Sequence, residues 1–150
     1  MAFKSYMGLA MRAAREAGQR GETPVGAVLI DPKGGRLVAE AGNRVRELSD
    51  PTAHAEILAI RAACAAAGSP RLPGLDLWVT LEPCAMCAAA IAASRIARVY
   101  YAAPDPKSGG VEQGARIFSQ SQSHHTPEVY GGIEAAEAAQ LLQDFFAALR

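Results

Sequence analysis

The sequence lacks a hydrophobic run long enough to cross a membrane. Its longest uncharged apolar stretch, Pro83 to Ser94, falls well short of the ~20 residues that a spanning helix needs. The N-terminal segment starts with a charge and an apolar run, but Arg12, Arg15 and Glu16 interrupt that run, unlike the apolar core of a signal peptide. We therefore expect no association with a membrane.

An excess of charge of either sign is also lacking. The 15 basic and 15 acidic residues cancel to a formal net charge of zero. The chain therefore has no general positive field to attract nucleic acid, and any such binding must depend on a local patch. Half of the 150 residues are hydrophobic, which excludes a disordered chain. Without a repeat or a long linker, residues 1–150 are predicted to form a single domain.

Cysteine is scarce, with only Cys64, Cys84 and Cys87 in the chain. An odd number of cysteines argues against a disulfide scaffold and favours a reducing compartment. In such a compartment a close pair of cysteines more often binds a metal or takes part in catalysis. The cysteines therefore predict a cytoplasmic protein.

Apolar periodicity predicts helices that alternate with strands. Helices are expected over 3–17, 53–67, 83–94 and 134–149, and strands over 24–31, 36–43, 75–81, 97–103 and 128–133. The first two strands form a hairpin around "PKGG", and 104–127 is a loop. This order predicts an α/β fold in which one mixed five-stranded sheet carries helices on both faces.

The segment "EPCAMC" contains the close cysteine pair, Cys84 and Cys87. At the start of a helix they share one face, and the positive end of the helix dipole favours their thiolate forms. Such a pair could be ordinary core residues, a redox pair or metal ligands. A redox pair usually follows the first strand of its fold, whereas this one comes much later, so its position favours a metal.

A histidine and a glutamate in "TAHAEI", His54 and Glu56, provide the partner motif. Residues two apart on a helix point in nearly opposite directions. They can face one site only if that site lies just beyond the helix tip, and "DPT" before them is a helix-start signal. His54 with the cysteine pair would give three ligands to zinc and leave a fourth position for water, which is typical of catalytic zinc. Glu56 could then transfer protons.

A closed structural zinc site would need a fourth protein ligand, and Cys64 is the candidate. Cys64 lies almost three helical turns beyond His54, which is roughly 15 Å along the axis. It cannot reach the same ion, so we assign it to the core.

The combined pattern H-x-E…P-C-x-x-C is the signature of zinc-dependent nucleobase deaminases. Together with "ETPVGAVLI", "DPTAHAEI", "LWVTLEPCAMC", "SRIARVYYAAPDPKSG" and "LLQDFF", it resembles bacterial tRNA-specific adenosine deaminases over most of the chain. The resemblance implies a three-layer α/β/α cytidine-deaminase-like fold. It also implies hydrolytic conversion of adenosine to inosine at the wobble position of tRNA, most often arginine tRNA.

Residue by residue, the resemblance implies one Zn²⁺ per subunit on His54, Cys84 and Cys87, with Glu56 as the proton shuttle. It further implies substrate contacts, which we give together: Asn43 to the flipped base, the Ala55 backbone to the base or reacting centre, Val25 in the apolar wall, and Asp105 and Lys107 to neighbouring nucleotides. The partner would be the tRNA anticodon loop, and the protein would be a homodimer.

Several alternatives stay open at this stage. A deaminase of free guanine, adenine or cytosine would share every zinc residue, and the neutral net charge fits it. A binding module stabilised by zinc, without catalysis, would need a closed four-ligand site. Phe145 and Phe146 have the spacing of core residues, although one could line the anticodon groove by family analogy. His124 and His125 are interpreted as solvated loop residues.

Overall fold

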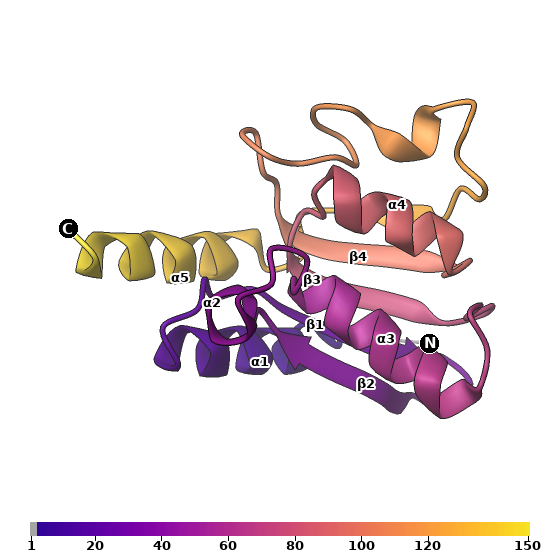
Figure 1. Cartoon of the computed structure of the whole chain (residues 1–150), viewed down its shortest axis with the longest axis horizontal. Coiled ribbons are helices and arrows are strands. Elements are labelled where there is room, and N and C mark those ends of the chain that lie inside the picture. Colours follow the sequence, from indigo (N-terminus) through magenta and orange to yellow (C-terminus); the bar gives the residue numbers. More distant parts are fainter. Residues whose placement is uncertain (1–2) are drawn as a thin grey trace.

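The computed structural model describes residues 3–150, which form a five-stranded sheet with helices on both faces (Figure 1). The elements in chain order are α1 (Met7–Gln19), β1 (Gly26–Asp31), β2 (Arg36–Gly42), α2 (Val45–Leu48), α3 (Ala55–Ala67), β3 (Asp76–Leu81), α4 (Ala85–Ala93), β4 (Arg98–Ala103), the 3-10 turn η1 (Ile117–Ser119), β5 (Glu128–Tyr130) and α5 (Ala135–Ala148). The predicted fold class is confirmed.

The strands lie in the order β2-β1-β3-β4-β5. β1 pairs antiparallel with β2 and with β3, whereas β3, β4 and β5 run parallel. The β1–β2 hairpin turns at Gly34 and Gly35, which both have positive φ, a conformation that glycine adopts without steric cost. α4 makes the crossover between β3 and β4 that a parallel pair requires.

Each face of the sheet packs against its own helices because successive side chains of a strand point to opposite faces. Leu29 of β1 belongs to the cluster that contains Ala59 of α3. The next residue back, Val28, belongs to the cluster that contains Met11 of α1. β1 is thus buried on both faces, which explains why its sequence is a continuous apolar run instead of an alternating one.

Two predicted helix boundaries differ from the structure. The first helix is predicted to start at residue 3, but α1 begins at Met7, and Phe3 is 67% exposed. Pro83 was expected to be the first residue of its helix. Instead Cys84, in an extended conformation with ψ 174°, is the N-cap of α4. The extended conformation of Cys84 delays the start of α4 until Ala85.

The closing helix α5 is less buried than its apolar spacing predicts. Ala138 is its one buried residue, and Phe146 is 44% exposed. α5 contacts β4, β3 and α1, and its C-terminal half extends beyond the sheet (Figure 1). The interpretation of Phe146 as a core residue is therefore wrong, because Phe146 lies in the half of α5 that extends beyond the sheet.

No helix in residues 3–150 combines the length and the apolar character that a membrane span requires. The carboxyl ends of β3 and β4 lie along the border of the sheet where α3 and α4 begin. By edge of the sheet we mean this border formed by strand ends, and not an edge strand. In open α/β sheets, this edge is where ligands bind.

Candidate active site

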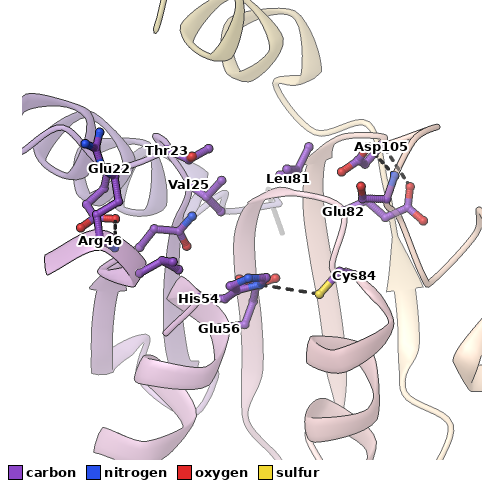
Figure 2. Close-up of a pocket in the computed structure, with 13 residues that line it drawn as sticks. Glu22, Thr23, Val25, Arg46, His54, Glu56, Leu81, Glu82, Cys84 and Asp105 are labelled. Atoms are coloured by element: carbon purple, nitrogen blue, oxygen red, sulfur yellow. Dashed lines mark hydrogen bonds between the residues drawn. The ribbon is translucent and has the colours of Figure 1, made fainter. Parts of the chain in front are cut away.

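The N-termini of α3 and α4 meet at this edge, with His54 as the N-cap of α3 and Cys84 as the N-cap of α4. Both caps have extended backbone conformations, with ψ 153° and 174°. Their side chains therefore project beyond the helix tips and face each other (Figure 2). This is the arrangement that the spacing of His54 and Glu56 predicted.

Three possible ligand atoms converge here. His54 Nδ1 lies 3.6 Å from Cys84 Sγ and 3.5 Å from Cys87 Sγ, and the three ligand atoms are within 4.8 Å of one another. Zinc bonds of ~2.3 Å to sulfur and ~2.0 Å to nitrogen hold tetrahedral ligands about 3.5–3.8 Å apart. The donor set and its spacing therefore fit one zinc ion, and Nδ1 is the imidazole nitrogen that faces it.

The two thiols are electrostatically unequal. A hydrogen bond from Cys87 lowers the pKa of Cys84 to about 4, and the bond to Cys84 raises the pKa of the Cys87 thiol. The Cys84 thiol is therefore the more acidic of the two. Because a divalent cation deprotonates the thiols that coordinate it, zinc bound here would hold both sulfurs as thiolates.

Glu56 is buried beside the three ligands and has a solvent-accessible fraction of 4%. Burial raises the pKa of its carboxyl to about 7, because desolvation disfavours the charged form. A carboxyl that titrates near neutral pH can both accept and donate a proton during turnover. Glu56 is not among the three converging ligands, so its carboxyl is available for proton transfer.

A pocket of about 330 Å³ opens above these residues, and His54, Glu56 and Cys84 line its floor. Val25, which is 5% exposed, contributes an apolar wall together with Leu81 (Figure 2). A pocket of this size that joins an apolar wall to a few polar groups is typical of a small-molecule or nucleobase site.

Asn43 lines the same pocket and also supports α3. Its Oδ1 accepts a hydrogen bond from the Ala55 backbone N–H at 2.8 Å, which satisfies an amide at the helix start that has no partner within the helix. Within residues 3–150 the Nδ2 group of Asn43 has no acceptor, so it can donate to a ligand. The Ala55 N–H already has this acceptor, and the predicted contact of the Ala55 backbone with the substrate stays a prediction.

A second pocket of about 430 Å³ adjoins the first and shares Asp105 with it. Lys107 lines only this second pocket, as does Phe146 of α5. Asp105 Oδ1 accepts the backbone N–H groups of Lys107 and Ser108, which fixes the turn. Among the predicted substrate residues, Val25 and Asn43 thus line only the first, deep pocket, Lys107 lines only the second, outer pocket, and Asp105 lies where the two pockets join.

The sequence interpretation missed two buried carboxylates beside the pocket, Glu22 and Glu82, each 2% exposed. Glu22 accepts backbone N–H groups of Arg46 and Glu47 and so holds α2 at one rim. Glu82 holds the loop at the opposite rim. An acidic residue beside an otherwise apolar run was the available signal: Glu22 comes just before the run in "ETPVGAVLI", and Glu82 comes just after the run in "LWVTLEPC".

The remaining candidates lie outside the site. Cys64 is half-buried and packs against the core below α3, as predicted. His124 is exposed. The interpretation of His125 as a solvated residue is wrong, because its Nε2 lies 2.8 Å from the Ile96 carbonyl oxygen and ties the loop to the start of β4.

Comparison with known proteins agrees with this geometry. Residues 2–103 match the family described as the cytidine and deoxycytidylate deaminase zinc-binding region. The chain is 58% identical to the tRNA-specific adenosine deaminase of Agrobacterium fabrum, over 94% of this chain and 91% of that protein.

Solved structures of deaminases also resemble this chain. A structure from a study of A-to-I editing by tRNA:A34 deaminases is 58% identical, with a TM-score of 0.88 over 91% of this chain and 98% of the other. Guanine deaminase from Bacillus subtilis is 39% identical, with a TM-score of 0.64 over 69% of this chain and 66% of the other. The chain therefore belongs to the zinc-binding cytidine and deoxycytidylate deaminase family and, within it, to the tRNA-specific adenosine deaminases.

Proposed function

We propose that the protein is a zinc-dependent hydrolase that converts adenosine to inosine at the wobble position of tRNA, with arginine tRNA as its substrate. The observation that carries this proposal is the position of Glu56, buried at the floor of a pocket beside the ligand set His54, Cys84 and Cys87. The 58% identity to a tRNA-specific adenosine deaminase supports the choice of substrate.

Hydrolytic deamination forms a C6–O bond from water, breaks the C6–N bond of adenine and releases ammonia. Zinc held by His54, Cys84 and Cys87 would supply a water molecule whose pKa is lowered to about 7. Glu56 takes a proton from water and passes it to N1 of the purine ring as the C6–O bond forms. It then takes the proton of the new C6 hydroxyl group and passes it to the amino group, which departs as ammonia and leaves a C6 carbonyl. Burial raises the pKa of the Glu56 carboxyl, which suits both transfers because a group whose pKa is closer to neutral can accept and donate a proton more readily.

The deep pocket would receive the flipped base. Val25 packs against the ring, and the free Nδ2 group of Asn43 donates a hydrogen bond to it, while its Oδ1 keeps the bond to Ala55. The Ala55 backbone lies at the same helix start and is proposed to contact the reacting centre. Bases in an anticodon loop can be splayed out at little cost and read at their edges.

The outer pocket would receive the neighbouring nucleotides. Asp105 and Lys107 lie on its rim, and the exposed ring of Phe146 offers a surface for base stacking. Arg46 lines the deep pocket on the other side. Since the chain is neutral overall, Lys107 and Arg46 would supply the local positive charge that phosphates require.

We further propose a homodimer that is formed through α4 and located in the cytoplasm. The sequence of α4, "AMCAAAIAA", has no charged residue, yet Ala85, Met86, Ala89 and Ala93 are exposed. A helix that is apolar on every side is usually buried, and a second copy would cover this face.

Residues 1–150 are proposed to act as one catalytic domain, because both pockets lie at one edge of a single sheet.

The alternative function is deamination of a free nucleobase such as guanine. The neutral charge and the 39% identity to a guanine deaminase favour it.

Measuring ammonia release distinguishes the two functions, with free guanine as one substrate and an arginine anticodon stem-loop with adenosine at the wobble position as the other. We expect turnover of the stem-loop, with a KM that rises steeply with salt because phosphate contacts release counterions. Turnover of guanine alone would contradict the proposal.

A further inference from the structure

Glu82 follows β3 directly and carries a buried carboxylate that the deamination chemistry does not use. Its Oε1 accepts the backbone N–H of Asp105 at 3.0 Å. Its Oε2 accepts the N–H groups of Val111, Glu112 and Gln113 at 3.2, 2.9 and 3.0 Å. One carboxylate thus binds both ends of the loop 105–113 (Figure 2 shows the bond to Asp105).

These N–H groups take the place of a counter-charge. No ion pair within residues 3–150 involves Glu82, although a buried carboxylate is costly without polar partners. Hydrogen bonds to an ionised acceptor are about twice as strong as bonds between neutral groups. The loop backbone is therefore held by a group whose charge strengthens each contact.

The same loop is pressed against the turn that carries the first cysteine ligand. The Gly110 N–H donates to the Pro83 carbonyl at 2.8 Å, and Gly109 forms a β-bridge with Cys84. A Cβ added at Gly109 would lie 2.7 Å from the Glu82 carboxyl group. This approach is too close for any side chain, so glycine is required where the loop meets the ligand turn.

The loop also forms part of the substrate pockets. Asp105 and Ser108 line both pockets, and Lys107 lines the outer one. Because Glu82 lies only two residues before Cys84, it links the position of these loop residues to that of the metal ligands.

We propose that Glu82 is a positioning residue that holds the loop 105–113 at the distance from the metal-ligand turn that the RNA substrate requires. The inference rests on the proposed tRNA deaminase function. Both carboxylate oxygens of Glu82 are bonded to the loop backbone, so we expect its effect on substrate binding and not on the chemical step.

The substitution Glu82→Gln tests this directly because it preserves shape but leaves one acceptor oxygen. If the amide oxygen of the new glutamine accepts the N–H groups of Val111–Gln113, its NH₂ group takes the place of Oε1 opposite the Asp105 N–H. Two donors then face each other, and the hydrogen bond to Asp105 is lost. We expect KM for the anticodon stem-loop to rise roughly tenfold, the effect of losing one hydrogen bond to a charged group. We expect kcat and zinc content to stay near the wild-type values, and amide exchange at Asp105 to become faster.

Asp76→Asn is the matched control. Asp76 begins β3 at the opposite end from Glu82 and is also buried, with 6% exposure. The same change from carboxylate to amide there should lower thermal stability but leave KM unchanged. A general effect of losing a buried charge is thereby separated from the positioning of the loop.

Gly109→Ala gives a second variant that disturbs the same contact from the loop side and keeps Glu82. Its Cβ would also lie 2.5 Å from the Asp105 carbonyl oxygen, so we expect the same rise in KM. Gly8→Ala is its control, because a Cβ at that position would meet nothing within 4 Å apart from its chain neighbours and the backbone of its own helix.

The proposal is overturned if Glu82→Gln and Gly109→Ala both keep the wild-type KM, or if Glu82→Gln loses zinc or lowers kcat alone. A failure of the proposed function has a different signature, since wild-type protein loaded with zinc would then make no inosine in the stem-loop. In that case the inference is tested by the dissociation constant of a fluorescently labelled arginine anticodon stem-loop, measured for both proteins. Equal dissociation constants for wild type and Glu82→Gln would reject it.

Discussion

His54 Nδ1 lies 3.6 Å from Cys84 Sγ, although 30 residues separate them in the chain. Each residue is the N-cap of a helix, α3 or α4, and the two helices begin at the same edge of the sheet. The positive ends of two helix dipoles therefore point at one place, which stabilises thiolates there. His54 and Cys84 both line the deep pocket, so the ligand set is open to a substrate that enters it.

We expect Glu56→Gln to abolish turnover and leave the zinc content intact. The amide has nearly the same shape, but it cannot accept and return a proton, and general acid–base catalysis contributes roughly 10²- to 10⁴-fold. Inosine formation gives kcat, and elemental analysis gives the zinc content per chain. Near-normal turnover by this variant would remove Glu56 from the mechanism.

Replacing a ligand should remove the metal together with the stability that it supplies. We expect Cys87→Ser to lose zinc and to unfold at a lower temperature. At a free zinc concentration a thousand times its Kd, the ion adds about 4 kcal/mol to the free energy of unfolding. Cys64→Ser is the control, because Cys64 is not among the converging ligands and this variant should keep its zinc.

Two substitutions of Asn43 should separate its structural role from its proposed contact with the base. Asn43→Ala leaves the Ala55 N–H without its acceptor, which should cost about 1–3 kcal/mol of stability as well as activity. Asn43→Asp keeps an acceptor for Ala55 but has no N–H to donate. We therefore expect this variant to melt near the wild-type temperature and still lose activity; equal activity would contradict the base contact.

Arg98→Met should destabilise the protein in a pH-dependent way. Burial raises the pKa of Asp76, and the hydrogen bond from Arg98 opposes this shift. Without Arg98 the pKa of folded Asp76 rises further, so the loss of stability is present at pH 7. It fades as the pH falls through that pKa, because the neutral carboxyl needs no partner.

Denaturant unfolding at pH 7 and pH 4 measures this effect. We expect a loss of about 1 kcal/mol at pH 7, since solvent screens the half-exposed Arg98, and a smaller loss at pH 4. Arg36→Met, which removes the exposed partner of Asp31 at 3.8 Å, should change little at either pH. A loss for Arg98→Met that is equal at both pH values would contradict the assignment to Asp76.

The sequence was sufficient to predict the ligand set because its geometry is local. His54 and Glu56 are two residues apart at a helix start, and Cys84 and Cys87 are three apart at another. Helical periodicity alone limits where such side chains can point. The one long-range assumption was that the two helix starts meet over one ion. The structure explains why they do, since β3 lies between them in the chain and returns the backbone to the edge where α3 begins.

The roles of Glu22, Glu82 and His125 could not be predicted in the same way. Each side chain bonds to backbone groups more than 20 residues away, and no local pattern specifies such partners. The exposure of Phe146 was missed for a related reason. Its helical spacing is that of a core residue, but its burial depends on how far α5 extends beyond the sheet.

The central claim is tested most directly by position-resolved mass spectrometry of arginine tRNA incubated with the zinc-loaded protein. We expect inosine at the wobble adenosine and at no other adenosine, and none with Glu56→Ala. A wobble adenosine left unchanged by folded, zinc-loaded wild-type protein, or inosine formed equally by the Glu56→Ala variant, would contradict the account.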